Sequence, residues 1–207
     1  TEDGLPPAAP SPSASEPAPL EREFSAREAV RTSAFWLLAL GHGFALLVVT
    51  AVNVHAISHM KEGLGYTLPQ ASLVIMLMTM AQACGVLLGA AMGDRWNKRY
   101  VAAGCMLAHA LGLLMLTWAV HPLMLGAFAV LHGFAWGLRG PFMQAIRADY
   151  FGRTYYGAIL GTSSLVTMFG SILGPLVFSA CVLLLSREAT FLFFAMCLVV
   201  SAICIAT

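Results

Sequence analysis

The sequence predicts an all-α membrane protein with six transmembrane helices. Hydrophobic residues make up 59% of the 207 residues and charged residues only 10%, against roughly 25% charged in an average soluble domain. Six apolar runs are each long enough to cross the hydrocarbon core as a helix, which takes about 20 residues. Short segments that contain most of the Lys and Arg residues separate these runs. We expect the spans at residues 34–58, 69–92, 99–120, 122–148, 156–184 and 188–207.

The chain before the first span divides into two segments. Residues 1–20 consist mainly of Pro, Ala, Ser and acidic residues, and such a segment cannot bury enough apolar surface to fold, so we expect a disordered linker. In residues 21–33, Ser25 and Glu28 have the spacing of a capping box, and the segment also contains Arg22, Arg27 and Arg31. This pattern predicts a short amphipathic helix at the membrane surface, leading into a six-helix bundle at 34–207.

The distribution of basic residues predicts the orientation in the membrane. One side would carry Arg22, Arg27, Arg31, Arg95, Lys98, Arg99, Arg147 and Arg153. The other side would carry only Lys61 and Arg187. Because Lys and Arg concentrate in loops that stay in the cytoplasm, we expect both chain ends to be cytoplasmic. The expected location is the plasma (inner) membrane.

Several classes of protein are disfavoured. No basic stripe exists apart from the loop clusters, which argues against nucleic acid as a partner. The five cysteines lie inside apolar runs without C-x-x-C spacing, so we expect neither a metal site nor another cofactor. The sequence shows no nucleophile with a placed base and no phosphate-binding loop, so we do not expect an enzyme.

Glycine spacing predicts how the helices meet, because small residues four apart let membrane helices approach closely. Such sets occur at Gly85, Gly89 and Gly93, at Gly133 and Gly137, at Gly157 and Gly161, and at Gly170 and Gly174. The pairs Gly140-Pro141 and Gly174-Pro175 are candidate kink sites. Kinked helices are tolerated where neighbours or a water-filled cavity satisfy the freed carbonyls, which favours a transporter over an anchor.

Three segments resemble a known family. The turn G-D-R-W-N-K-R at 93–99 resembles the G-x-x-x-D-R-x-G-R-K loop signature of the major facilitator superfamily, with Ala90 and Asn97 at its two glycine positions. The segment A-R-E-A-V-R-T-S-A-F-W-L-L at 26–38 resembles the start of the seventh helix in monocarboxylate-transporter-like members, a group related to oxalate/formate antiporters. The segment at 147–161 resembles the loop between their tenth and eleventh helices.

The resemblance implies that residues 21–207 are helices seven to twelve, the C-terminal half of the fold, and that 1–20 belong to the central cytoplasmic linker. The partner would be the N-terminal six-helix half of the same protein. The implied function is secondary transport of a small organic anion by alternating access, coupled to protons or to a counter-anion. The eleventh helix at 156–184 carries no Lys or Arg, which argues against oxalate as the substrate.

Polar residues inside the spans are the candidate substrate-binding groups, because ionisable side chains in hydrocarbon usually face a cavity. These candidates are Arg139, His132, His42, Asn53 and Gln82. Arg139 follows His132 by two helical turns on one face, and its guanidinium offers a planar fork to a carboxylate. The alternatives are that each histidine makes only an interhelical hydrogen bond, and that Arg139 extends to the cytoplasmic headgroups or pairs with Asp149 or Asp94.

The basic turn is a candidate gating loop, made by Asp94, Arg95, Lys98 and Arg99. A carboxylate at a helix end can pair with a basic residue in one conformational state only and so hold that side closed. By resemblance, helices nine and twelve face lipid, which places His109 outside the substrate path. A second reading of the chain remains open, namely a six-helix membrane interaction subunit or dimerising half without transport activity of its own.

Overall fold

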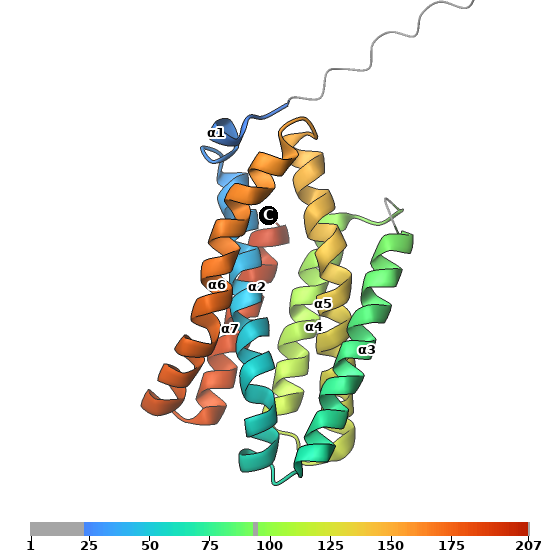
Figure 1. Cartoon of the computed structure of the whole chain (residues 1–207), viewed down its shortest axis with the longest axis vertical. Helices are drawn as coiled ribbons and strands as arrows, with labels where there is room; N and C mark the ends of the chain where they lie inside the picture. Colours follow the sequence, from blue (N-terminus) through green and yellow to red (C-terminus); the bar gives the residue numbers. More distant parts are fainter. Residues whose placement is uncertain (1–22, 93–94, 207) are drawn as a thin grey trace, which may run out of the picture.

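Six long helices run side by side in the computed structural model, which describes residues 23–92 and 95–206 (Figure 1). They are α2 (Ser33–Ser58), α3 (Leu68–Met92), α4 (Lys98–Thr117), α5 (Pro122–Phe151), α6 (Tyr156–Leu184) and α7 (Arg187–Ala206). All six are long and apolar enough to cross a membrane, and the described residues contain no strand. The predicted all-α, six-helix fold class is therefore confirmed.

The helix ends follow local chemistry. The Asn97 side chain caps α4 by accepting a hydrogen bond from the Arg99 backbone N–H, and Pro122 occupies the first turn of α5, where its missing N–H costs nothing. Gly152, with φ of 82°, ends α5. Two ends differ from the sequence prediction by three residues: α4 stops at Thr117, short of residue 120, and α5 continues to Phe151, past residue 148.

A short helix precedes the bundle. The predicted capping box at Ser25 and Glu28 is present at the start of α1 (Ala26–Ala29). The Phe24 backbone N–H donates to the Phe151 carbonyl at 3.1 Å, and the Glu23 carboxylate accepts from the Thr154 N–H at 3.0 Å. Hydrogen bonds from Thr154 hold the pKa of the exposed Glu23 carboxyl below its usual range. We call residues 23–32 the N-terminal strap, because they tie the chain before α2 to the α5–α6 turn; the expected linker at 1–20 lies outside the described residues.

The helices form two groups of three. In one group α6 and α7 pack on α2, and in the other α3 and α4 pack on α5. Extensive packing of α4 against α7 joins the groups, whereas α2 and α5 share few contacts (Figure 1). In α3 and α6 only 17% of the most apolar stretch is buried, against 44% to 56% in the other four helices. The core therefore lies among α2, α4, α5 and α7, and α3 and α6 each leave a broad apolar surface uncovered.

Glycine brings helices into contact at two interfaces, as predicted. Between α3 and α5, a Cβ added to Gly133 would overlap the Met78 carbonyl, and one added to Gly137 would overlap that of Gln82. Between α2 and α6, a Cβ added to Gly170 would overlap the Gly43 carbonyl. Gly157 and Gly161 differ, because each has open space at its Cβ position. The spacing rule thus selected glycines of the α3–α5 and α2–α6 interfaces, but it also selected a pair whose Cβ positions meet none of the described residues.

Candidate functional site

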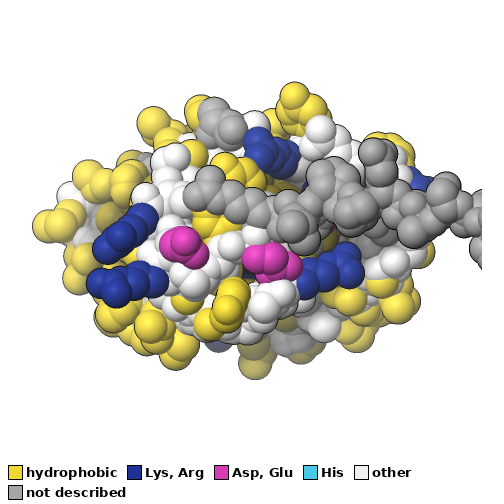
Figure 2. Space-filling model, turned by 90° about the horizontal axis from the view of Figure 1, so that it is seen from above, with side chains coloured by type: hydrophobic (Ala, Val, Ile, Leu, Met, Phe, Trp, Pro, Cys, Tyr) yellow, Lys and Arg dark blue, Asp and Glu magenta, His cyan; other side chains and the backbone are white. Residues whose placement is uncertain are grey.

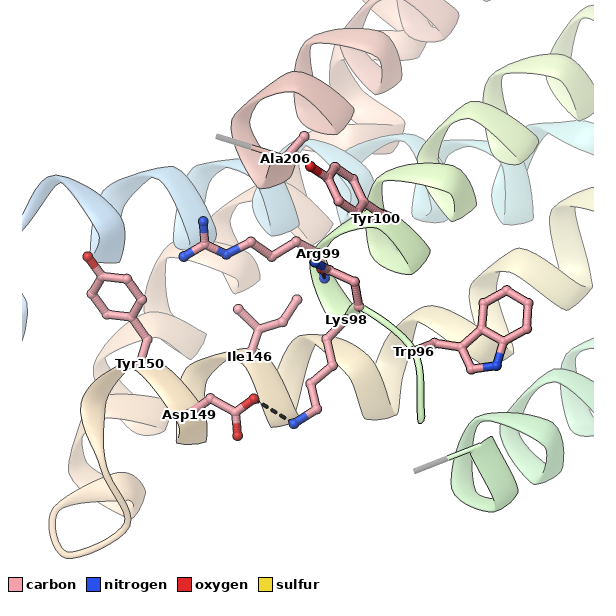
Figure 3. Close-up of a pocket in the computed structure, with 9 residues that line it drawn as sticks. Trp96, Lys98, Arg99, Tyr100, Ile146, Asp149, Tyr150 and Ala206 are labelled. Carbon is pink, nitrogen blue, oxygen red and sulfur yellow. Dashed lines mark hydrogen bonds and ion pairs between the residues drawn. The ribbon is translucent and has the colours of Figure 1, made fainter. Parts of the chain in front are cut away.

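The basic turn between α3 and α4 is tied to the end of α5. Lys98 Nζ lies 2.5 Å from a carboxylate oxygen of Asp149, and the Arg99 guanidinium lies 5.9 Å from the centre of the Tyr150 ring. Figure 3 shows the Lys98 side chain directed across to α5. Two of the predicted gating residues therefore contact α5. Arg95 is exposed, and Asp94 lies outside the described residues.

A cavity of about 570 Å³ opens beside this turn. Charged groups from the turn and aromatic rings share its lining, which consists of Trp96, Asn97, Lys98, Arg99, Tyr100, Ile146, Asp149, Tyr150 and Ala206 (Figure 3). Figure 2 looks onto this end of the molecule, where basic and acidic side chains gather inside an apolar perimeter. Basic and aromatic residues are typical of a membrane–water interface, so this end is expected to lie at the headgroup level.

A second polar group lies inside the bundle. Arg139 is only 1% exposed, and its Nε and Nη1 atoms have no hydrogen-bond partner among the described residues. Arg139 lies about 26 Å along α5 from Pro122 and about 18 Å from Phe151, at 1.5 Å per residue. That position is well inside the span. Asp149 binds Lys98 instead, and no other described carboxylate pairs with Arg139.

Arg147 is a second buried guanidinium on α5. It is 3% exposed, its Nη2 atom donates to His42 Nδ1 on α2 at 2.8 Å, and its Nη1 atom lies 3.5 Å from the Met143 carbonyl. Sequence analysis counted Arg147 only among the basic residues of the cytoplasmic side, near the end of the span expected at 122–148; in the structure α5 continues past it to Phe151, and its side chain is buried. The Arg147–His42 bond spans the seam between α2 and α5, where the two helices share few other contacts.

Two fully buried histidines complete the group. His132 Nδ1 lies 3.1 Å from His109 Nδ1, so one of these atoms carries the proton that the other accepts. The Nε2 atoms of both rings have no partner among the described residues. Arg139 interacts electrostatically with both rings and with His42. His109 thus faces the interior, contrary to the lipid-facing position that the resemblance implied for its helix.

The described part of the chain provides no negative charge to this group. The described carboxylates are those of Glu23, Glu28, Glu62, Asp149 and Glu188, and none of them pairs with Arg139 or Arg147. A charged side chain at the centre of a membrane helix costs at least about 2.5 kcal/mol even by the lowest estimates. Two buried guanidinium groups without a carboxylate make this region strongly attractive to an anion. We call Arg139, Arg147, His42, His109 and His132 the buried cationic cluster.

The predicted substrate-binding residues do not all meet. Arg139, His132 and His42 belong to the buried cationic cluster, but Asn53 is exposed on α2, about 16 Å along the helix from His42. Gln82 is partly buried on α3, where its backbone carbonyl lies against Gly137. Sequence analysis did not assign Arg147 or His109 to the site. The position of each inside an apolar run was the available signal.

No three of the described His, Cys, Asp and Glu side chains are placed to hold a metal ion. No curated protein matches the chain. The model of the Major Facilitator Superfamily matches residues 19–207, which is nearly the whole chain and includes all six long helices. The chain therefore belongs to the major facilitator superfamily, a family of membrane transporters and not of enzymes.

Proposed function

We propose that this chain is the C-terminal half, helices seven to twelve, of a secondary transporter that moves a small, monocarboxylate-like organic anion by alternating access. Transport is coupled to protons or to a counter-anion. The observation that carries the proposal is the buried cationic cluster, in which Arg139 and Arg147 have no carboxylate partner among the described residues. A substrate carboxylate supplies the missing charge.

Physical cost favours an anionic ligand over a purely structural role. A buried guanidinium without a counter-charge is destabilising, and removing that penalty is a source of binding energy. Arg139 keeps two guanidinium nitrogen atoms, Nε and Nη1, without a partner among the described residues, and each can donate to a carboxylate oxygen. His132 and His42 add polar groups beside it.

The seam between α2 and α5 is the proposed entry route. These helices share few contacts, and the Arg147–His42 hydrogen bond crosses the seam. Movement of one three-helix group relative to the other, about the α4–α7 interface, would break this bond and expose the guanidinium groups. Asn53 and Gln82 would then contact substrate along the opened path.

The basic turn acts as the gate on the cytoplasmic side. The Lys98–Asp149 ion pair and the Arg99–Tyr150 contact hold the turn against α5 in this conformation. A contact made in one state only biases the equilibrium between the two states by its own free energy. Asp94 and Arg95 belong to the same gate, with both chain ends on the cytoplasmic side of the plasma membrane.

The N-terminal half of the protein would cover the apolar surfaces of α3 and α6. Both helices pack on one neighbour and leave most of their apolar residues uncovered. Two six-helix bundles that rock about a site at the bilayer midplane are the usual basis of alternating access. The proposed cavity would lie between the halves, next to the seam.

A counterflow screen of the full-length protein in proteoliposomes tests this function. Liposomes are loaded with an unlabelled compound, and uptake of the labelled compound is followed for monocarboxylates, dicarboxylates and amines of similar size. We expect saturable exchange of a small carboxylate and none of the amines. Exchange of amines alone would contradict the proposal, and no exchange of any compound would favour an interaction subunit.

A further inference from the structure

A cleft with two charged groups in its lining lies at the end of α2 opposite the basic turn. It has a volume of about 340 Å³, within the range of small-molecule sites. It lies between the C-terminal end of α2, the π-helical turn η1 (His59–Gly63) that continues it, and the α6–α7 turn. Its lining consists of His55, Ser58, His59, Glu62, Phe178, Ser179, Val182, Leu183 and Arg187. Single π-helical turns are rare and occur often at functional sites.

One negative and one positive group lie at the rim. Glu62 Oε2 is 3.5 Å from Arg187 Nη2, and the two side chains are 67% and 35% exposed. An ion pair that is this long and exposed contributes little to stability, so both groups keep bonding capacity for a ligand. The cleft as a whole is neutral, which disfavours a ligand with net charge.

His59 supplies a buried hydrogen-bond acceptor next to this pair. The ring is 5% exposed, and its Nε2 atom lies 3.2 Å from the Leu116 carbonyl, which accepts the proton that Nε2 carries. In this tautomer Nδ1 is an acceptor, and it has no partner among the described residues. A Cβ atom added to Gly63 would lie 3.0 Å from His59 Nδ1 and 2.8 Å from Arg187 Nη1. These two nitrogen atoms therefore face the same small space beside Gly63.

The part of the lining that α6 provides is largely apolar and consists of Phe178, Val182 and Leu183, with Ser179 beside them. The His55 ring stacks on Phe178 with centroids 4.5 Å apart. A ligand that fills the cleft would therefore need a charged or polar end and a short apolar body.

We propose that this cleft binds a small zwitterion with an apolar body, of the class of the apolar α-amino acids. Its carboxylate would accept hydrogen bonds from Arg187, its ammonium group would donate to Glu62 and His59 Nδ1, and its side chain would lie against Phe178 and Val182. Each charge of the ligand meets the opposite charge, and the unpartnered acceptor of His59 receives a donor. This inference is independent of the anion transport proposed for the buried cationic cluster.

Three probes with one carbon skeleton test the ligand class. L-leucine carries the ammonium group, 2-hydroxyisocaproate replaces it with a hydroxyl, and 4-methylpentanoate lacks both. Equilibrium binding of each labelled compound to the full-length protein in nanodiscs is measured at neutral pH. Both acids are monocarboxylates that the buried cationic cluster could also hold, so binding to the cleft is taken as the part that Leu183→Trp removes. At the cleft we expect saturable binding of leucine, weaker binding of the hydroxy acid and none of 4-methylpentanoate. Equal binding of all three, or no saturable binding of leucine, would overturn the proposal.

Charge-removing variants locate the site. Arg187→Gln and Glu62→Gln should each weaken leucine binding about tenfold or more, because each removes one charge-assisted bond. Lys61→Gln removes a neighbouring charge outside the cleft and should leave binding unchanged. If a charge variant fails to fold, Leu183→Trp fills the cleft from an exposed position and should abolish binding. Unchanged leucine binding in Glu62→Gln or in Leu183→Trp would rule out this site.

Discussion

Arg139 and Arg147 lie on one helix, but their hydrogen bonding differs. Arg147 donates to His42 and contacts a carbonyl, whereas Arg139 keeps two nitrogen atoms without a partner among the described residues. A buried donor without an acceptor is costly, and such atoms occur where a water, an ion or a ligand binds. Arg139 is therefore the residue on which the anion proposal depends most directly.

Substitution of Arg139 separates charge from geometry. Arg139→Lys keeps the positive charge but loses the fork, so it should weaken substrate affinity about tenfold, which corresponds to about 1.4 kcal/mol. Arg139→Gln removes the charge and should abolish most transport at normal expression. Half-saturation constants from counterflow give the measurement. Equal affinity in the wild type and the Lys variant would contradict a substrate-binding role.

The ion pair at the gate can be tested through its acidic partner. Asp149→Asn keeps the shape and removes the charge that Lys98 contacts, so turnover should change severalfold while surface expression holds, because one state loses a stabilising contact. Glu188→Gln, at the start of α7 and the other end of the bundle, is the matched control. Asp94→Asn should lower turnover at normal surface expression. Unchanged turnover in both Asp149→Asn and Asp94→Asn would mean that the turn is only a solvated loop.

At the scale of helices, glycine decides which pairs approach closely. Gly133 and Gly137 lie under backbone carbonyls of α3, and Gly170 lies under the carbonyl of Gly43 on α2. Without a hydrophobic drive between membrane helices, this close approach of backbones is a main source of association. The two least buried helices, α3 and α6, are the ones held in this way.

A glycine comparison measures that contribution. Gly137→Val should separate α3 from α5 and lower stability by about 1–3 kcal/mol, the usual cost of overpacking. Gly161→Val adds the same side chain on α6 where the Cβ position is open and should have little effect. Thermal unfolding of both variants in the same detergent checks this. A similar loss in both would show that the cost comes from the helix itself and not from the interface.

Helix positions were predictable from the sequence because a span needs a long apolar run, and charged turns and Pro interrupt those runs. Whether a given side chain is buried in the bundle or faces the surroundings was less predictable. Arg147 lies near the end of the span expected at 122–148, and the sequence there does not show whether its side chain extends to the surface or is buried against another helix. His109 was placed outside the path because a whole helix was assigned to lipid, yet a helix has several faces and this ring points inward against His132.

As a whole, the molecule consists of two three-helix groups joined by α4 and α7. The surfaces of α3 and α6 remain open, and the seam between α2 and α5 lies between them (Figure 1). Such an arrangement provides one wall of a cavity. Movement of substrate across a membrane also requires an opposite wall that closes on alternate sides.

Residues 1–207 alone should therefore not transport. Reconstituted by themselves in liposomes, they should show no saturable uptake of a carboxylate that the full-length protein exchanges. Co-reconstitution with the proposed N-terminal six-helix half should restore uptake. Crosslinking reports whether the chain has dimerised. Saturable uptake by the monomeric chain would contradict the assignment as one half of a transporter.

The N-terminal strap also constrains the order in which the chain folds during synthesis. Glu23 and Thr154 meet although they are 131 residues apart in sequence, and Phe24 packs edge-on against Phe151 at 5.7 Å. Contacts with such separation form late, because the intervening chain must first exist and be ordered. The strap cannot dock until the chain has been synthesised through Thr154. A docked strap therefore marks a chain in which four of the long helices, α2 to α5, have already been synthesised.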